Sequence, residues 1–371
     1  VSDSCENFIY DSILSIDRLG VEQEVFALER INRDQRPFDP VHVLRKDASI
    51  GRRLPALAAR AFTPRADRFS RHWIGARNHL RDALVEQRID VVHAHFGPQG
   101  VLAMPALGPQ PLIVSFYGHD ISRLVQHAKW RRAYYRLWER ADAIYVLSED
   151  MARLAEAAHA PPDKIQIVHL GRRVSQLQWR PPRKRIAHLV SVGRLVEKKG
   201  HDDLIDALAE SQLDLTLDIV GDGPLHDQLE EKIRLAGLGN RVRLVGALNN
   251  DKALRLLEQA DAFVLASRTA SDGDKEGTPT VLIEAQALGL PCVSTLHAGI
   301  PEILPKENHH LLAPERDPSS LANALRVLES SSLDELKLIS KRGRSRVEQE
   351  FDTDRIAGHI VSDYHRHLGP S

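Results

Sequence analysis

The stretch EGTPTVLIEAQALGLPCVS, from Glu276 to Ser294, contains a complete structural unit. Its apolar residues predict a helix over residues 280–288 that leads directly into a strand over residues 292–295. A helix followed closely by a buried strand is the repeating unit of a parallel sheet with crossover helices. Two carboxylates interrupt this pattern, Glu276 before the helix and Glu284 within its apolar run, and both need an explanation of their own.

The same alternation continues along the rest of the second half. We predict its further elements from their periodicity: strands over 187–192, 215–220, 242–245 and 262–266, and helices over 201–210, 225–236, 251–259, 319–329, 333–351 and 353–368. In the first half we predict strands over 21–28, 89–93, 112–116, 143–147 and 165–169, and helices over 8–19, 130–139 and 149–159. Both halves therefore favour parallel α/β sheets.

A basic, proline-containing break separates the halves. Residues 171–185, GRRVSQLQWRPPRKR, have no clear period and read as a linker. We predict four parts, an N-terminal domain over 1–172, a linker over 173–186, a C-terminal domain over 187–351 and a last helix over 352–371. Two Rossmann-like, doubly wound domains then face a cleft, and ligands of such sheets bind beyond the carboxyl ends of the strands.

Composition excludes several classes of protein. The chain has 371 residues and a net charge of −1, so nothing global calls for a nucleic-acid partner. Two distant cysteines, Cys5 and Cys292, fit a reducing compartment, and no apolar run is long enough for a membrane helix. One segment is locally basic, with Arg52, Arg53, Arg60, Arg65, Arg68, Arg71, Arg77 and Arg81. We favour a solvated helical face over contact with an anionic membrane surface.

The carboxylates of the opening stretch suit a ligand at a helix N-terminus. We predict Thr278 as the cap and Pro279 as the first helical residue, with free amides and the helix dipole available to phosphate. Gly277 would let the backbone approach the ligand. Glu284 lies about one and a half turns into an amphipathic helix and can accept hydrogen bonds from two ribose hydroxyls, and Glu276 can do so from a sugar. The alternative for Glu276 is an ordinary loop carboxylate, and the alternative for Glu284 is a partly exposed residue of an amphipathic helix.

Two glycine-containing turns follow other strands. In SVGRLVEKKG, residues 191–200, a strand ends at Gly193, and Arg194 and Lys199 suit a diphosphate, the alternative being a solvated basic turn. In IVGDGPL, residues 219–225, the third glycine of the dinucleotide fingerprint is missing. This second turn predicts a tight strand-to-helix connection and makes a dehydrogenase the least favoured enzyme class.

Five stretches of the second half, taken in order, resemble glycosyltransferase family 4. They are SVGRLVEKKG, IVGDGPL, RVRLVGAL, DGDKEGTPTVLIEAQALGLPCVST and HAGIPEI. These are retaining enzymes of the GT-B fold that use a nucleotide sugar, and the resemblance is closest to the bacterial exopolysaccharide branch of the colanic-acid type. The first half adds CENFIYDSI, HAHFGPQGV and SFYGHDIS. The resemblance implies that the last helix crosses back to the N-terminal domain. It also implies a first strand and a glycine-containing loop before CENFI, which the given sequence does not contain; if the protein itself lacks them, the first-domain sheet loses its inner strand.

The resemblance assigns roles to the motif residues. Arg194 and Lys199 would bind the diphosphate and steady the leaving group, Glu276 would contact the donor sugar, and Glu284 would hold the ribose. The remaining donor-binding positions are Gly193 and Gly277, the amides of Thr280 and Val281, and Val245, Gly246 and Ser267 near the base. Either Tyr117 or His119 would contact the donor sugar, with His119 counted among the catalytic residues. His95 and Gly97 would line the acceptor side.

We therefore expect a retaining hexosyltransferase that moves a sugar from a UDP-sugar to a hydroxyl of a glycan or lipid-linked acceptor. Asp272-Gly273-Asp274 superficially resembles the Asp-x-Asp metal motif of a differently wired fold, and we favour a site that needs no metal and no cofactor. Gly171-Arg172-Arg173 departs from the Gly-x-Asp pattern of the family.

The alternatives to a hexosyltransferase are a GT-B epimerase and a non-catalytic nucleotide-sugar binder. The expected location is the cytoplasm, with peripheral contact to the inner face of the cell membrane left open.

Overall fold

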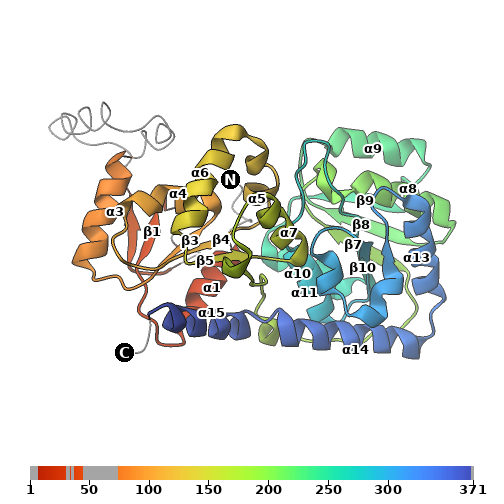
Figure 1. Ribbon diagram of the computed structural model, residues 1–371. Coiled ribbons are helices and arrows are strands. Elements are labelled where there is room, and N and C mark those ends of the chain that lie inside the picture. Colours follow the sequence, from red (N-terminus) through yellow and green to blue (C-terminus); the bar gives the residue numbers. More distant parts are fainter. Residues whose placement is uncertain (1–6, 31–33, 35–36, 45–73, 369–371) are drawn as a thin grey trace. The chain divides into compact units, whose positions relative to one another are not determined.

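The computed structural model describes residues 7–30, 34, 37–44 and 74–368, and its contacts divide the chain into two compact units (Figure 1). Unit 1 comprises Val1–Val168 together with Ala357–Ser371, and unit 2 comprises His169–Ile356. The chain therefore passes between the units twice, after Val168 and after Ile356. Both units are built on parallel sheets, which confirms the predicted α/β class.

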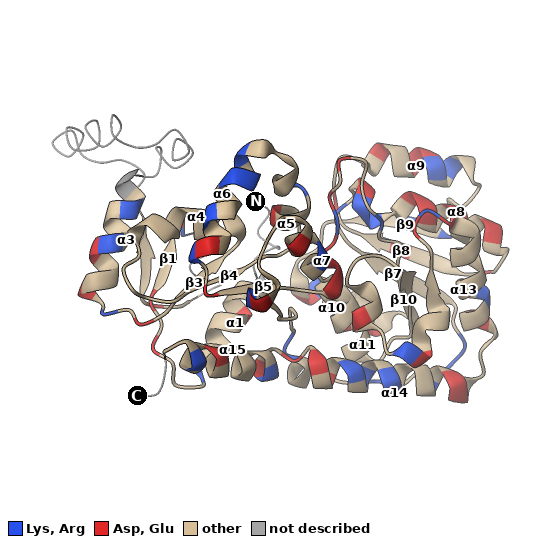
Figure 2. Ribbon diagram, in the orientation of Figure 1, with Lys and Arg blue, Asp and Glu red and all other residues tan. Residues whose placement is uncertain are grey.

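Unit 2 contains a six-stranded sheet with the order β12-β11-β10-β7-β8-β9, and every neighbouring pair is parallel. Its strands are β7 (His188–Val192), β8 (Thr216–Val220), β9 (Val242–Gly246), β10 (Ala262–Leu265), β11 (Cys292–Thr295) and β12 (Leu312–Ala313). Figure 2 shows β7 and β10 without charged residues, as expected for strands that are covered on both faces. The two-residue strand β12 was not predicted, because so short an element has no periodicity to detect.

Helices cover both faces of this sheet, and the alternation along each strand shows it. Leu189 and Val264 belong to one hydrophobic core, whereas their neighbours Val190 and Phe263 belong to a second. The helices of unit 2 are α8 (His201–Ser211), α9 (His226–Leu235), α10 (Asn250–Gln259), α11 (Thr280–Leu288), α12 (Ile300–Ile303), α13 (Pro318–Ser330) and α14 (Leu333–Glu350). Residues of α8, α9 and α13 enter the first core, and residues of α10, α11 and α12 enter the second.

The predicted linker, residues 173–186, packs into unit 2 instead of standing apart from it. The amide of Arg180 donates to the carbonyl of Leu288, and the side chain of Trp179 donates to Ser340 Oγ at 3.1 Å. Gly289 is required there, because a Cβ at this position would lie 2.3 Å from the carbonyl oxygen of Arg180. Val174 and Leu177, two apolar residues within the basic stretch, pack into the second hydrophobic core of unit 2. The sequence interpretation did not use these apolar residues.

Unit 1 contains two parallel sheets. A four-stranded sheet has the order β3-β4-β5-β6, from β3 (Val92–His95), β4 (Leu112–Ser115), β5 (Ala143–Val146) and β6 (Ile165–Ile167), and a two-stranded sheet pairs β1 (Val25–Ala27) with β2 (Val41–Val43). Strand β3 begins three residues later than predicted, because the amide of Ile89 donates to Leu84 at the end of the preceding helix. Strand β2, which follows Pro37 and Pro40, was not predicted. The predicted absence of an inner strand concerns residues before position 7, which lie outside the described residues.

The helices of unit 1 are α1 (Asn7–Asp17), α3 (Ile74–Glu86), α4 (Gly97–Ala103), α5 (His119–Ser122), α6 (Ala128–Arg140) and α7 (Glu149–Ala157). The last helix, α15 (Thr353–Leu368), belongs to unit 1 from Ala357 onward, where Tyr364 Oη lies 2.6 Å from His93 Nδ1. Within the described part of the chain, every helix is too short or too polar to cross a bilayer. Most of the basic segment, residues 52–71, lies outside the described residues.

Candidate functional site

The strand order of unit 2 reverses between β7 and β10. The chain runs outward from β7 to β8 and β9, and then returns to β10 on the other side of β7. Ligands of open parallel sheets bind beyond the carboxyl ends of the strands at such a reversal. The loop over 193–200 follows β7 and the loop over 266–279 follows β10. Both predicted donor motifs therefore flank the position where a ligand is expected.

Glycines shape the loop after β7. Gly200 has a φ of +61°, and a Cβ there would lie 1.9 Å from the carbonyl oxygen of Ala266, so the two loops meet closely only with glycine. A Cβ on Gly193 would lie 3.0 Å from Cδ and Cε of Lys199, so the stem of this lysine lies across Gly193. Arg194 is exposed, and its side chain has no ion-pair partner among the described residues.

Lys199 and Glu276 meet across the strand reversal. Lys199 Nζ lies 3.0 Å from Glu276 Oε1, and both side chains are largely buried. Burial alone would raise the pKa of Glu276, but the ammonium groups of Lys199 and Lys198 outweigh it and lower the pKa to about 2. The structure thus brings together two of the four predicted catalytic residues, and it holds Glu276 ionised at neutral pH.

Helix α11 begins at Thr280, as the predicted range of 280–288 has it, but its N-cap residue lies one position later than predicted. Pro279 has an extended backbone and is itself the N-cap residue, with no side-chain cap hydrogen bond, and the helix begins at Thr280. The predicted Thr278 cap is wrong, because proline at the cap position shifts the first helical residue and offers no side-chain acceptor. Gly277 is buried, and Thr280 and Val281 are partly exposed at this end. Uncapped amides at a helix N-terminus suit an anionic ligand.

Glu284 occupies a buried position, not one edge of an amphipathic helix. All residues from Leu282 to Leu288 are buried, so the predicted exposed face of α11 is absent from this described stretch. The carboxylate forms an ion pair with Arg172, whose side chain is also largely buried. Arg172 occupies the variable position of the family's Gly-x-Asp pattern, next to Arg173, which departs from it, and the role of Arg172 as the partner of Glu284 was missed.

Three further predicted donor positions lie at the same edge of the sheet. Val245 and Gly246 end β9, and Gly246 has a φ of +82° where its carbonyl accepts the amide of Gly221. Ser267 follows β10 and is fully buried. Its hydroxyl has no hydrogen-bond partner among the residues that the structure describes, although its carbonyl accepts from Thr295 Oγ1 at 2.5 Å. An orphaned buried hydroxyl fits a position that borders a ligand.

The carboxyl edge of the four-stranded sheet in unit 1 carries histidines and tyrosines. His95 ends β3, and its Nδ1 lies 2.5 Å from the hydroxyl of Tyr117, which follows β4. His93 contacts Ser115 Oγ at 2.7 Å, and its ring stacks on that of His95 at 4.4 Å. Burial lowers the pKa of His95 to about 4 and raises the pKa of the Tyr117 hydroxyl, so both groups are neutral at pH 7.

Asp120 holds the backbone at this edge, and it was not among the predicted site residues. Its buried carboxylate accepts the amides of Gly97 at 3.0 Å, Tyr117 at 2.9 Å and Gly118 at 3.1 Å. Burial raises the pKa of Asp120 to about 6, although these amides act in the opposite direction. Gly97 is also required by packing, because a Cβ would lie 2.4 Å from Phe116. His119, in contrast, is exposed at the first residue of α5.

The Asp272-Gly273-Asp274 stretch is held by local contacts. Asp272 Oδ1 accepts the amide of Asp274 at 3.0 Å, and Asp274 Oδ2 pairs with Lys198 Nζ at 3.1 Å. Gly273 has a φ of +81°, which closes the turn. The described residues contain no group of three or more His, Cys, Asp or Glu side chains that could hold a metal ion.

Two family models match the chain. The model described as "Glycosyl transferase 4-like domain" matches residues 6–171, and the model described as "Glycosyl transferases group 1" matches residues 180–346. The first match lies in unit 1 except for its last residues, 169–171, which belong to unit 2, and the second match lies entirely in unit 2. Together they span nearly all of both units.

Relatives match over almost the whole chain. WcaL of Escherichia coli, a protein named as a colanic acid biosynthesis glycosyltransferase, is 31% identical over 97% of this chain and 96% of its own length. The amylovoran biosynthesis glycosyltransferase AmsK of Erwinia amylovora is 30% identical over 94% of this chain and 93% of its own. Among solved structures, Anabaena HepE in complex with UDP has a TM-score of 0.77 at 20% identity, with 97% and 95% of the two chains covered.

Proposed function

The chain belongs to the family 4 glycosyltransferases of the GT-B fold, and on this premise we propose that it transfers a hexosyl group from a UDP-sugar to a hydroxyl of a glycan or lipid-linked acceptor. The names of WcaL and AmsK support an acceptor in the synthesis of a bacterial polysaccharide. The UDP complex of HepE supports a uridine donor. We further propose that the enzyme works in the cytoplasm, where the buried free thiol of Cys292 stays reduced.

The ion pair between Lys199 and Glu276 carries this proposal. It places a cation and an ionised carboxylate side by side, beyond β7 and β10, next to the uncapped N-terminus of α11. A nucleotide sugar needs both signs of charge, a cation for the diphosphate and an acceptor for the hydroxyls of the sugar. In the proposed complex, Lys199 and exposed Arg194 contact the diphosphate with the amides of Thr280 and Val281, and Glu276 accepts from the sugar.

The remaining donor residues follow from their places in unit 2. Glu284 accepts from the ribose hydroxyls, in exchange for part of its contact with Arg172. Ser267, Val245 and Gly246 border the base, and the orphaned hydroxyl of Ser267 supports this role. In unit 1, neutral His95 and Tyr117 provide hydrogen bonds suited to an uncharged sugar acceptor, and His119 is exposed at the same edge of the sheet.

The proposed reaction is a front-face displacement that retains the anomeric configuration. The bond between the anomeric carbon and the diphosphate oxygen breaks, and the acceptor oxygen bonds to the same face of that carbon. The acceptor proton passes to the departing diphosphate oxygen. Negative charge grows on the diphosphate as its bond breaks, and cations already fixed in place stabilise that charge. Lys199 meets this requirement, because it is buried and held by Glu276, so we propose that no metal is needed.

Calorimetric titration with UDP, GDP and ADP in EDTA tests the donor assignment. We expect UDP to bind at least about tenfold more tightly than the other two, and Glu284→Ala to weaken UDP binding by about 1–3 kcal/mol, the scale of hydroxyls left unpaired. Arg172→Met is the matched control, because it removes the ion-pair partner of Glu284 but leaves the carboxylate that would accept hydrogen bonds from the ribose. Binding that appears only with added Mg²⁺, or UDP affinity unchanged in Glu284→Ala, would contradict the proposal. Product analysis by NMR distinguishes transfer with retention from epimerisation.

A further inference from the structure

The loop from Ser267 to Glu276 is held at both of its ends by one carboxylate. Glu315 follows β12, and its Oε2 accepts the amide of Thr269 at 2.7 Å, at the beginning of the loop. Its other oxygen, Oε1, lies 2.6 Å from His297 Nδ1. His297 Nε2 in turn accepts the amide of Glu276 at 3.1 Å, at the end of the loop. A single acidic side chain therefore connects both ends of the loop, directly and through an imidazole.

The partners of His297 determine its tautomer. A backbone amide is always a donor, so the Nε2 atom that faces Glu276 must carry a lone pair and no proton. The proton of the neutral ring then lies on Nδ1 and is donated to Glu315 Oε1. His297 is fully buried, so the ring is fixed by packing as well as by these two bonds. Hydrogen bonding to His297 and Thr269 outweighs the burial of Glu315 and lowers the pKa of its carboxyl to about 2.

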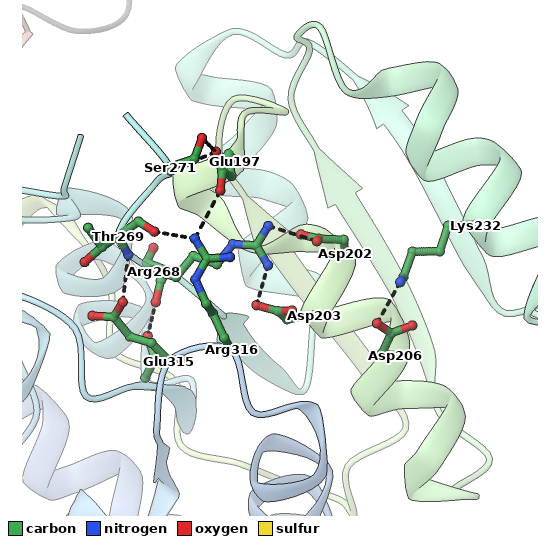
Figure 3. A network of polar contacts seen from close by, with 12 residues as sticks. Glu197, Asp202, Asp203, Asp206, Lys232, Arg268, Thr269, Ser271, Glu315 and Arg316 are labelled. Atoms are coloured by element: carbon green, nitrogen blue, oxygen red, sulfur yellow. Dashed lines mark hydrogen bonds and ion pairs between the residues drawn. The ribbon is translucent and has the colours of Figure 1, made fainter. Parts of the chain in front are cut away.

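A second set of contacts holds the beginning of the same loop (Figure 3). Arg268 is buried and donates to Asp203 Oδ2 at 2.7 Å and to Asp202 Oδ2 at 2.9 Å, both in the first turn of α8. Arg316 donates to the carbonyl of Thr269 at 2.7 Å and to Glu197 at 3.0 Å. These contacts hold Arg268 and the carbonyl of Thr269. Glu276 lies eight residues after Arg268, where Lys198 Nζ donates to the carbonyl of Lys275 at 3.3 Å and the amide of Glu276 donates to His297.

We propose that His297 and Glu315 are positioning residues that hold the backbone of Glu276, so that its carboxylate stays beside Lys199 and faces the donor sugar. The inference deepens the proposed function, because it rests on the role of Glu276 as the group that contacts the sugar. His297 acts through the amide of Glu276 and does not itself contact the donor. The carboxylate at position 315 is required because both of its oxygens accept hydrogen bonds, which an amide side chain cannot reproduce.

Two substitutions of His297 separate the two bonds. Asparagine places an N–H near the position of Nδ1 and keeps the bond to Glu315, but it loses the acceptor for Glu276. Glutamine places a carbonyl near Nε2 and keeps the bond to Glu276, but it loses the bond to Glu315. Both remove a buried imidazole, so a purely structural role predicts similar effects of the two. His310→Asn is the matched control, because His310 is exposed and its only hydrogen-bond partner among the described residues is the carbonyl of Glu307.

Hydrogen exchange of the peptide over residues 269–277 is the first measurement, and it needs no ligand. His297→Asn should speed exchange at the Glu276 amide by about fivefold, the factor for one lost hydrogen bond, and His297→Gln should not. Glu315→Gln should speed exchange at Thr269 or at Glu276, because its amide group must face one of two donors. Equal exchange in the asparagine and glutamine variants would overturn the arrangement.

Turnover with a UDP-sugar is the second measurement. We expect kcat of His297→Asn to fall about 10- to 100-fold, as for a displaced catalytic group, with a smaller fall for His297→Gln and unchanged affinity for UDP alone. Faster exchange at Glu276 with wild-type kcat would overturn the positioning role. If the wild-type protein transfers no sugar at all, the proposed function fails, and the exchange result still decides whether the contact holds the loop.

Discussion

The carboxyl edges of the two sheets are built from opposite chemistry. In unit 2, the loops beyond β7 and β10 hold buried ion pairs, Lys199 with Glu276 and Lys198 with Asp274. In unit 1, the residues beyond β3 and β4 are mainly uncharged at neutral pH, with His95 hydrogen-bonded to Tyr117. Burial disfavours charge at both edges, and the loops of unit 2 supply opposite charges that compensate it.

The difference teaches how each edge is adapted to its proposed ligand. A diphosphate requires a fixed cation, and a buried cation requires a carboxylate partner while the site is empty. A sugar acceptor offers hydroxyls, which neutral imidazole and phenol groups can bind without a charged partner. The pKa of Glu276 lies at about 2 and that of Asp120 at about 6, so the two carboxyls depart from their ordinary values in opposite directions.

Lys199→Ala breaks the charged edge and should have the largest effect. We expect kcat to fall about 10²- to 10³-fold, because the departing diphosphate loses a fixed cation. Stability should also fall, since the buried carboxylate of Glu276 loses its partner, and the double variant Lys199→Ala/Glu276→Ala should recover part of that loss. The measurements are steady-state kinetics and urea unfolding.

Lys232→Ala provides the control for Lys199. Its ammonium pairs with Asp206 at 2.6 Å on a partly exposed surface of the same unit (Figure 3). Because such pairs contribute little, kcat should stay within about twofold of the wild type. A fall of less than roughly tenfold in Lys199→Ala would argue against its proposed role at the leaving group.

The pH dependence of stability should differ in sign between the two edges. The pKa of Asp120 is raised from 3.8 to about 6, so its contribution to stability is present below pH 4 and is lost as pH rises through 6. The pKa of Glu276 is lowered from 4.5 to about 2, so its contribution is present above pH 4.5 and is lost as pH falls through 2. Each contribution is at most about 3 kcal/mol.

Urea unfolding of Asp120→Asn and Glu276→Gln across pH 3 to 7 tests these signs. The stability difference between wild type and Asp120→Asn should become less favourable to the wild type as pH rises from about 4 to 7. The difference from Glu276→Gln should become more favourable to the wild type as pH rises from about 3 to 5. If both stability differences change in the same direction as pH rises, the two edges do not differ in the sign of their pH dependence.

Much of unit 2 could be predicted from its sequence, because its strands are apolar and its turns carry glycine. Strand β11 and helix α11 match the predicted bounds of 292–295 and 280–288. The same reasoning placed Lys199 and Glu276 at one edge, since the carboxyl ends of parallel strands meet there. His297 follows β11 at that edge within the HAGIPEI motif, so the rule that found Glu276 could have found His297 as well.

Other residues could not be found in this way, because their partners lie far away in the sequence. Arg172 meets Glu284 only after the chain segment over 171–174 packs against residues 351–353. Asp120 acts through backbone amides, one of them at Gly97, and no spacing rule connects these positions. In unit 1, the predicted strand over 89–93 ended two residues before β3 does, because the half-buried histidines of β3 are accommodated by hydrogen bonds and not by hydrophobicity.

Tyr117→Phe alters the neutral edge and should have the smallest effect. It removes the hydroxyl that contacts His95 but keeps the ring, which packs at 4.9 Å from Phe8 and 4.7 Å from Phe96. We expect a loss of about 1 kcal/mol in the free energy of unfolding, the value of one neutral hydrogen bond, and unchanged affinity for UDP. The loss should be the same at about 0.05 and 1 M salt, because no charge is involved. A loss that disappears at high salt, or weaker binding of UDP, would mean that this edge also depends on charge, and the contrast with the edge at Lys199 would fail.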